Sequence, residues 1–143
     1  MAKEGSSSGR ANWIVTATVL AMGQEIGQMN YEGHGVIISD GGKGLLHNAT
    51  AHVVGGGLMK KGVYDNDTGL ISYTRPDGDQ IFITYKVAGQ MGKPGKGTGT
   101  IVGGTGKLVG ITGTIEFTRY SLRPPVKGIM SSFSISKLSW KLP

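Results

Sequence analysis

The sequence contains no cysteine. It can therefore form no disulfide, no thiolate metal site and no cysteine nucleophile. Histidine is also scarce, with three copies at His34, His47 and His52. His47 and His52 lie five positions apart, so on one strand they would face opposite sides, and no third ligand is spaced nearby. We therefore expect no metal site.

Long apolar runs are missing as well. No segment approaches the ~20 consecutive apolar residues of a membrane-spanning helix, so we expect a soluble chain without a membrane span. The first residues, MAKEGSSSGRAN, are polar and contain no apolar core of a signal peptide. Two origins stay open for them: the start of a mature exported domain whose signal was removed, or an added tail. The compartment is unknown, and we expect residues 1–10 to be a disordered tail.

Acidic side chains are few. The 9 aspartates and glutamates stand against 15 lysines and arginines, which gives a formal net charge of +6 and a pI near 9.7. Such a charge attracts nucleic acid, anionic lipid and acidic ligands. The basic residues are nevertheless scattered over turns, as in GGKG, MKKG and GKPGKG, with no clustered run. We expect no specific nucleic-acid partner, although basic flanks near the loops favour an anionic small molecule.

The pattern that is present has a period of two, which is typical of β-strands. Trp13, Val15 and Ala17 alternate with polar neighbours, as do Ile81, Ile83, Tyr85 and Val87. Predicted strands cover 12–22, 28–39, 45–54, 58–64, 70–75, 80–87, 96–103, 110–120 and 129–141. Turns are predicted at 39–44, 64–69, 75–79 and 103–107. This spacing predicts an all-β fold, in which residues 11–143 form a single closed antiparallel β-barrel of about eight strands with a central apolar cavity.

The stretch KGTGTIVGGTGKLVGITGTIEFTR, residues 96–119, resembles a phosphate-binding loop only superficially. The glycine that must precede Gly106 and Lys107 by five residues is replaced by Ile101, and Leu108 replaces the required serine or threonine. Its many β-branched residues favour strands instead. We therefore predict a hairpin, in which the glycines at 97, 99 and 113 let the sheet curl tightly.

Two motifs carry a resemblance to a known group of barrels. The segment GGTGKLVGITGTIEF is similar to the glycine-rich hairpin of the allene oxide cyclase-like and dirigent-like β-barrels. The preceding YTRPDGDQIFITY resembles a hairpin of bacterial members of that superfamily. The similarity covers roughly residues 64–120. It implies an eight-stranded calycin-type barrel, often a dimer or trimer, that works without a cofactor by holding a reactive substrate in one conformation.

Candidate functional residues follow from the faces of the predicted strands. Tyr73 and Tyr85 lie on the apolar faces of their strands, so both are candidates for the barrel interior, either as ordinary packing or as hydrogen-bonding groups of a ligand site. Glu32 and His34 lie two apart, on the same side of a strand, a spacing that could pair a carboxylate with an imidazole for acid-base catalysis. Glu116 is expected to face solvent.

Three functions of different class remain open at this point. The first is a binding module for a small apolar or amphipathic molecule. The second is a cofactor-free cyclase or isomerase on the same barrel, of the allene oxide cyclase-like kind. The third is an oligomerising structural or interaction protein with a filled barrel. In all three we expect a homo-oligomer, dimer or trimer, and we expect the loop SLRPPVKG at 121–128 to cap one mouth or contact another subunit.

Overall fold

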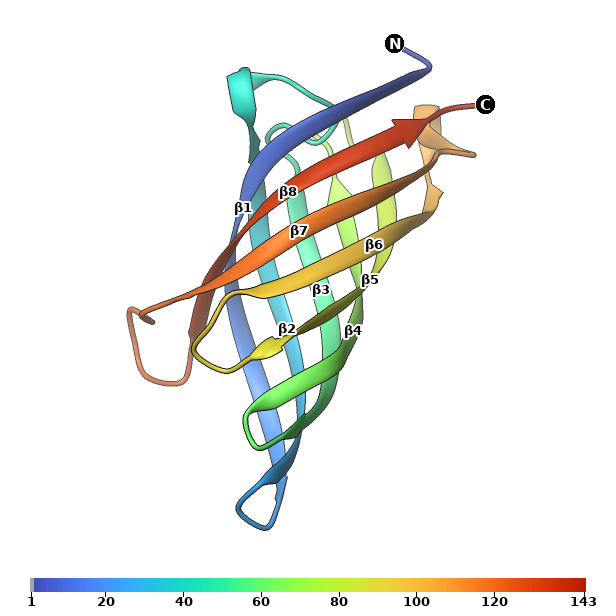
Figure 1. The fold of residues 1–143 in the computed structure, drawn as a ribbon. Helices are drawn as coiled ribbons and strands as arrows, with labels where there is room; N and C mark the ends of the chain where they lie inside the picture. The colour runs from blue at the N-terminus through green and yellow to red at the C-terminus, as the bar shows by residue number, and fades with distance from the viewer. Residues whose placement is uncertain (1) are drawn as a thin grey trace.

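Eight strands with alternating buried and exposed residues close into an antiparallel barrel (Figure 1). The computed structural model describes residues 2–143. The strands are β1 (Glu4–Met22), β2 (Ile26–Ser39), β3 (Thr50–Lys60), β4 (Val63–Thr74), β5 (Gln80–Gln90), β6 (Gly95–Gly104), β7 (Thr112–Leu122) and β8 (Met130–Lys141). Each strand pairs with the next one, and β8 pairs with β1 to close the sheet. The predicted fold class is confirmed.

The antiparallel order gives the barrel two different ends. The connections β1–β2, β3–β4, β5–β6 and β7–β8 lie at one end, which we call the open end. The connections β2–β3, β4–β5 and β6–β7 lie at the other end together with both chain termini, and we call this the closed end (Figure 1). The hairpin of β1 and β2 projects furthest at the open end (Figure 1).

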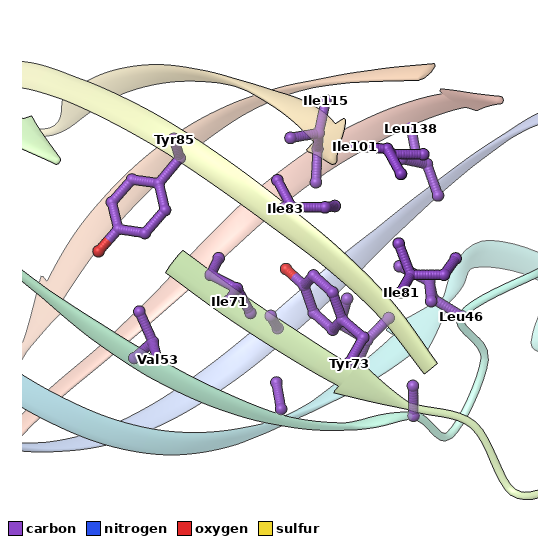
Figure 2. Close-up of a cluster of buried hydrophobic side chains, with 14 of the residues drawn as sticks. Leu46, Val53, Ile71, Tyr73, Ile81, Ile83, Tyr85, Ile101, Ile115 and Leu138 are labelled. Carbon is purple, nitrogen blue, oxygen red and sulfur yellow. The ribbon is translucent and has the colours of Figure 1, made fainter. Parts of the chain in front are cut away.

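Apolar side chains fill the closed half of the barrel. Ile81, Ile83 and Leu108 are fully buried there, and Tyr73 is 2% exposed. Figure 2 shows Tyr73, Ile81, Ile101 and Leu138 converging from different strands. The connection between β2 and β3 contributes Leu46, which is buried among them and covers this end. Water is therefore excluded from the closed half, and burial of this apolar surface stabilises the barrel.

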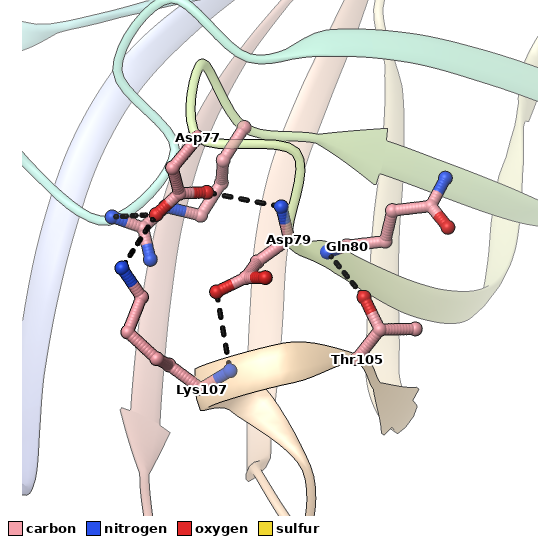
Figure 3. A network of polar contacts seen from close by, with 6 residues as sticks. Asp77, Asp79, Gln80, Thr105 and Lys107 are labelled. Atoms are coloured by element: carbon pink, nitrogen blue, oxygen red, sulfur yellow. Dashed lines mark hydrogen bonds and ion pairs between the residues drawn. The ribbon is translucent and has the colours of Figure 1, made fainter.

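Polar contacts tie the connections of the closed end together (Figure 3). Asp77 accepts a hydrogen bond from the backbone N–H of Asp79 over 3.0 Å and forms an ion pair of 3.2 Å with Lys107. Asp79 in turn accepts a hydrogen bond from the backbone N–H of Lys107 over 3.1 Å. The backbone hydrogen bond from Asp79, with smaller contributions from Lys107 and Arg75, holds the pKa of the Asp77 carboxyl below its ordinary value.

Two expectations about strand boundaries are wrong. Residues 4–10 do not belong to a disordered tail, because they form the first part of β1 and pair with the end of β8, from Glu4 with Lys141 onward. Serine and glycine weaken strand propensity in this segment, but the backbone pairing does not depend on side chains. The segment 45–49, predicted as strand, belongs to the β2–β3 connection, where Leu45 and Leu46 are buried.

The third correction concerns YDNDTG at 64–69, which the sequence predicts as a turn. These residues continue β4, and the turn lies earlier, at Lys61 and Gly62, which both have positive φ. The pairing of β4 with β5 shifts register between Tyr64 and Asp67, which marks a β-bulge. The predicted strand 58–64 thus contains the end of β3, the turn and the start of β4. The predicted strand 70–75 is the second part of β4, and the bulge inside β4 positions a buried carboxylate.

Candidate functional site

The open half of the barrel contains a cavity of about 130 Å³. Apolar and aromatic side chains form most of its wall, and serines of β8 form a narrower polar part. The aromatic lining residues are Trp13, Tyr31, Tyr64, Tyr73, Tyr85 and Phe117; the aliphatic ones are Val15, Val53, Ile71 and Ile115; the methionines are Met29, Met91 and Met130. The expected apolar cavity is therefore present, but it occupies the open half and not the full length of the barrel.

Two tyrosines meet across a pair of glycines in the cavity wall. Tyr31 of β2, Gly55 of β3, Gly69 of β4 and Tyr85 of β5 are consecutive cross-strand partners. Because the two glycines have no side chains, the tyrosine rings lean over them and their hydroxyl groups form a short hydrogen bond. A Cβ atom added to Gly69 would lie 2.5 Å from the Tyr85 Oη atom. The glycine pair is thus a steric requirement of this contact.

The bulge in β4 brings a carboxylate to the tyrosine pair. Regular alternation after Tyr64 would direct Asp67 outward, but the bulge places Asp65 and Asn66 outside and leaves Asp67 3% exposed. The Tyr31 hydroxyl donates a hydrogen bond of 2.6 Å to Asp67 Oδ1. Since Tyr31 has one hydroxyl hydrogen, Tyr85 must be the donor in the hydrogen bond between the two tyrosines.

An arginine from β7 neutralises the buried carboxylate. Arg119 Nη2 donates to Asp67 Oδ2 over 2.8 Å, and the Arg119 side chain is 25% exposed. The Arg119 Cζ atom lies 5.5 Å from the centroid of the Tyr64 ring. Glycines again make room, because a Cβ atom on Gly89 or Gly95 would lie 2.7 or 2.5 Å from the Tyr64 Oη atom. Four strands therefore contribute to one connected group, Tyr85, Tyr31, Asp67, Arg119 and Tyr64, which we call the tyrosine–aspartate–arginine cluster.

Burial determines the protonation state of the cluster. Burial raises the pKa of Tyr85 to about 12, although its hydrogen bond with Tyr31 acts in the opposite direction. Burial also raises the pKa of Tyr31 well above its ordinary range, and neighbouring Tyr85 and Asp67 raise it further. Burial lowers the pKa of Arg119, but the Asp67 carboxylate and hydrogen bonds to Tyr64 and Asp67 more than offset this effect, so the pKa is raised overall. At neutral pH both tyrosines are protonated and Arg119 is a cation.

These tyrosines make the stability of the barrel depend on pH in alkaline solution. The pKa values of Tyr31, Tyr73 and Tyr85 are all raised by burial, so above pH 10 the unfolded chain loses protons that the folded chain keeps. We expect the free energy of unfolding to decrease as the pH rises from 10 to about 12, with Tyr85 alone contributing on the order of 2 kcal/mol. Urea unfolding at a series of pH values measures this. Tyr85→Phe should show a smaller decrease, and an equal decrease in both proteins would contradict the assignment.

The inward face of β8 adds a column of hydroxyl groups. Ser132, Ser134 and Ser136 all line the cavity, opposite the strands that carry the tyrosine pair. Ser134 accepts a hydrogen bond of 3.3 Å from Trp13 Nε1, so the indole N–H is already satisfied. The charged lining residues in the described part of the chain are Lys93 and Arg119, which are both cationic. The cavity wall thus presents hydrogen-bond donors and positive charge to an occupant.

The structure separates the candidate residues into two groups. Tyr73 and Tyr85 lie inside the barrel, as expected, and both line the cavity. Glu32 and His34 share one side of β2, as expected, but this side is the outer surface and neither residue lines the cavity. Glu32 instead approaches His52, with 3.4 Å between Oε2 and Nε2, and His52 stacks on His34. Glu116 is exposed, as expected.

Sequence reasoning did not identify Tyr31, Asp67 and Arg119. The sequence predicts a turn at Asp67 because Asp, Asn, Thr and Gly surround it, and this composition is typical of turns. A better signal was available in the glycines of β3 and β4. Gly55 and Gly69 stand inside strands, where a missing side chain often marks the close approach of another group.

No protein-family model matches this chain, and no curated protein matches it either. Within residues 2–143, no group of three histidines, aspartates or glutamates could hold a metal ion. The same residues include no helix long and apolar enough to cross a membrane.

Proposed function

We propose that the open half of the barrel binds a small amphipathic molecule, with its apolar part in the cavity and an anionic group at Arg119. This proposal rests on how polar groups are distributed around the cavity. Most of the wall is apolar or aromatic, and the tyrosine–aspartate–arginine cluster lies in one part of it. Ligand sites in proteins are commonly built this way, from an apolar pocket with a few convergent polar groups.

The volume of the cavity limits the part of the ligand that it can enclose. A cavity of about 150 Å³ in an engineered protein is large enough for benzene. The cavity of about 130 Å³ described above therefore matches a single six-membered ring or a short branched chain. A larger molecule would extend through the open end.

The hydrogen-bonding groups favour an acceptor on the ligand. The hydroxyl hydrogens of Tyr31 and Tyr85 and the indole N–H of Trp13 are already donated within the protein. Arg119 has five N–H groups, and contacts with Asp67 and Tyr64 leave others for a ligand. Lys93 lies at the same wall. A carboxylate is the group best matched to an arginine that keeps free N–H donors.

Catalysis is the second candidate function, and one feature favours it. The chain of hydrogen bonds from Tyr85 through Tyr31 to Asp67 could hold or move a proton at the cavity wall. A cofactor-free cyclase or isomerase, of the kind implied by the resemblance to allene oxide cyclase-like barrels, would need such a group together with a shaped cavity. Turnover of a bound compound would distinguish this candidate from binding alone.

Titration with small aromatic probes tests the binding proposal. The chain has two tryptophans, so a Trp140→Phe variant leaves Trp13 at the cavity as the only indole reporter. We expect benzoate to change the Trp13 fluorescence and to bind about tenfold or more tightly than benzyl alcohol, because Arg119 would form charge-assisted hydrogen bonds with a carboxylate.

Two serine variants of β8 provide the control. Ser132→Phe should fill the cavity and abolish benzoate binding, whereas Ser139→Phe places the same side chain on the exposed face of the same strand and should bind as before. If Ser132→Phe binds benzoate as well as Ser139→Phe does, the cavity is not the binding site. If benzoate and benzyl alcohol bind equally, Arg119 does not select an anion.

A further inference from the structure

Exposed apolar side chains surround the mouth of the barrel at its open end. Leu20 and Met22 lie near the tip of the β1–β2 hairpin, Val63 and Met91 lie next to two other connections, and Leu122 and Val126 belong to the β7–β8 region. All six are between 43% and 67% exposed. We call these six residues the apolar rim. They come from all four connections of the open end, so they form a border around the mouth of the cavity and not a patch on one strand.

Basic residues accompany the apolar rim. The segments 19–26, 58–65, 89–95 and 121–130 contain five basic residues against two acidic ones, Glu25 and Asp65. The basic residues are Lys60, Lys61, Lys93, Arg123 and Lys127, and all five are exposed. Lys61 and Glu25 form an exposed ion pair of 4.0 Å, so the remaining charge at this end is mainly positive.

The closed end differs in charge. Its connections, residues 40–49, 75–79 and 105–111, contain three basic and three acidic residues. Apolar side chains at that end are similarly exposed, among them Ile38 at 46%, Val102 at 58% and Val109 at 65%. Exposed apolar residues alone are common on protein surfaces. The open end is distinguished because its apolar residues are combined with excess positive charge around the mouth of a cavity.

We propose that the open end docks on the surface of an anionic lipid bilayer. The apolar rim would enter the interface between headgroups and acyl chains, and the surrounding lysines and Arg123 would contact lipid phosphates and carboxylates. Charge complementarity favours this occupant over a second copy of the chain, because two copies joined through their open ends would bring two positive surfaces together. Docking would place the mouth of the cavity at the membrane surface.

Sedimentation with lipid vesicles tests the proposal without any cavity ligand, so its result is independent of the proposed binding function. We expect the protein to sediment with vesicles of phosphatidylcholine containing about one third phosphatidylserine, and to bind pure phosphatidylcholine vesicles at least tenfold more weakly. High salt should reverse the binding to the anionic vesicles.

Two pairs of variants locate the docking surface. Arg123→Ala with Lys127→Ala should weaken binding about twenty-fivefold, since each basic residue contributes about fivefold at an anionic surface. Lys43→Ala with Lys137→Ala changes the net charge equally, away from the open end, and should have little effect. Leu20→Ser with Met22→Ser should weaken binding about tenfold. Val102→Ser with Val109→Ser removes similarly exposed apolar side chains near the closed end and should leave vesicle binding unchanged.

Several outcomes would overturn the proposal. Equal binding to neutral and anionic vesicles, or no binding to either, contradicts an anionic lipid partner. Equal losses in the open-end and control variants would show that net charge, and not this surface, drives binding. If the open-end variants change the oligomer mass in native mass spectrometry and leave vesicle binding unchanged, the rim is a contact between copies of the chain.

Discussion

Asp67→Asn is expected to lower the free energy of unfolding by about 3 kcal/mol, the cost of breaking a buried ion pair from one side. The Asp67 side chain is 4% exposed and accepts hydrogen bonds from both Tyr31 and Arg119. Without the carboxylate, the Arg119 cation remains in the barrel wall with no opposite charge beside it. Urea unfolding should show an earlier midpoint with an unchanged dependence on urea concentration.

The sequence offers a matched control two positions earlier. Asp65 is exposed, so Asp65→Asn removes the same charge from the same strand and should change the stability by less than about 0.5 kcal/mol. Combining Asp67→Asn with Arg119→Met should recover part of the loss, because the methionine removes the cation that Asp67→Asn alone leaves unpaired. Equal losses in Asp65→Asn and Asp67→Asn would contradict the role of the buried pair.

Gly69→Ala is expected to have the second largest effect, a loss of about 2–3 kcal/mol through overpacking. Gly69 does not have positive φ, so alanine can adopt its backbone conformation without strain. The effect of the substitution therefore comes from the added methyl group. This group would lie 2.5 Å from the Tyr85 Oη atom and 2.5 Å from the backbone oxygen of Val54. The Tyr85 ring would have to move, and its hydrogen bond with Tyr31 would be disrupted.

Gly103 provides the comparison for this variant. It lies in β6 without positive φ, and an added Cβ atom would approach no atom closer than 3.4 Å. Gly103→Ala should therefore leave the stability unchanged or increase it by up to about 1 kcal/mol, because alanine restricts the unfolded chain. Thermal and urea unfolding of both variants measure the difference. A tolerated Gly69→Ala would mean that the tyrosine pair does not depend on the open space above the glycine.

The sequence predicted the architecture because each strand is encoded locally. Alternating residues such as Ile81, Ile83 and Tyr85 place one face in the core, and RPDGD fixes the β4–β5 turn, where Gly78 has the expected positive φ. The glycine-rich hairpin was also correct: the Phe117 ring packs over Gly97, and an added Cβ on Gly99 would lie 2.8 Å from Ile115. The barrel closes when β8 pairs with β1, and this pairing needs no sequence motif beyond the strands themselves.

The candidate site was only partly predictable. Tyr85 followed from alternation, but Asp67 depends on a bulge that no local pattern specifies, because the bulge is defined by the pairing of β4 with β5. Arg119 reaches Asp67 from a strand 52 residues away in sequence. Glu32 and His34 had a suitable spacing, yet alternation alone does not say which face of β2 is inside. The burial of Tyr31, their neighbour, is what places them outside.

The cavity proposal and the docking proposal fit one arrangement of the molecule. The closed end is filled by Leu46, Leu108 and their neighbours, and its connections are balanced in charge. The open end combines a cavity, an apolar rim and excess positive charge. Docking would bring the mouth of the cavity to a bilayer surface, where the apolar part of an amphipathic molecule partitions. Each proposal nevertheless has its own experiment, and either can fail alone.

Methyl NMR during a benzoate titration tests the central claim most directly. Ile71 and Ile115 line the cavity, whereas Ile81 and Ile101 belong to the core outside the lining. We predict that benzoate shifts the methyl resonances of Ile71 and Ile115 in a saturable way and leaves those of Ile81 and Ile101 in place. Saturable binding with no shift at Ile71 or Ile115, or shifts of equal size at all four isoleucines, would contradict a ligand site in the open half of the barrel.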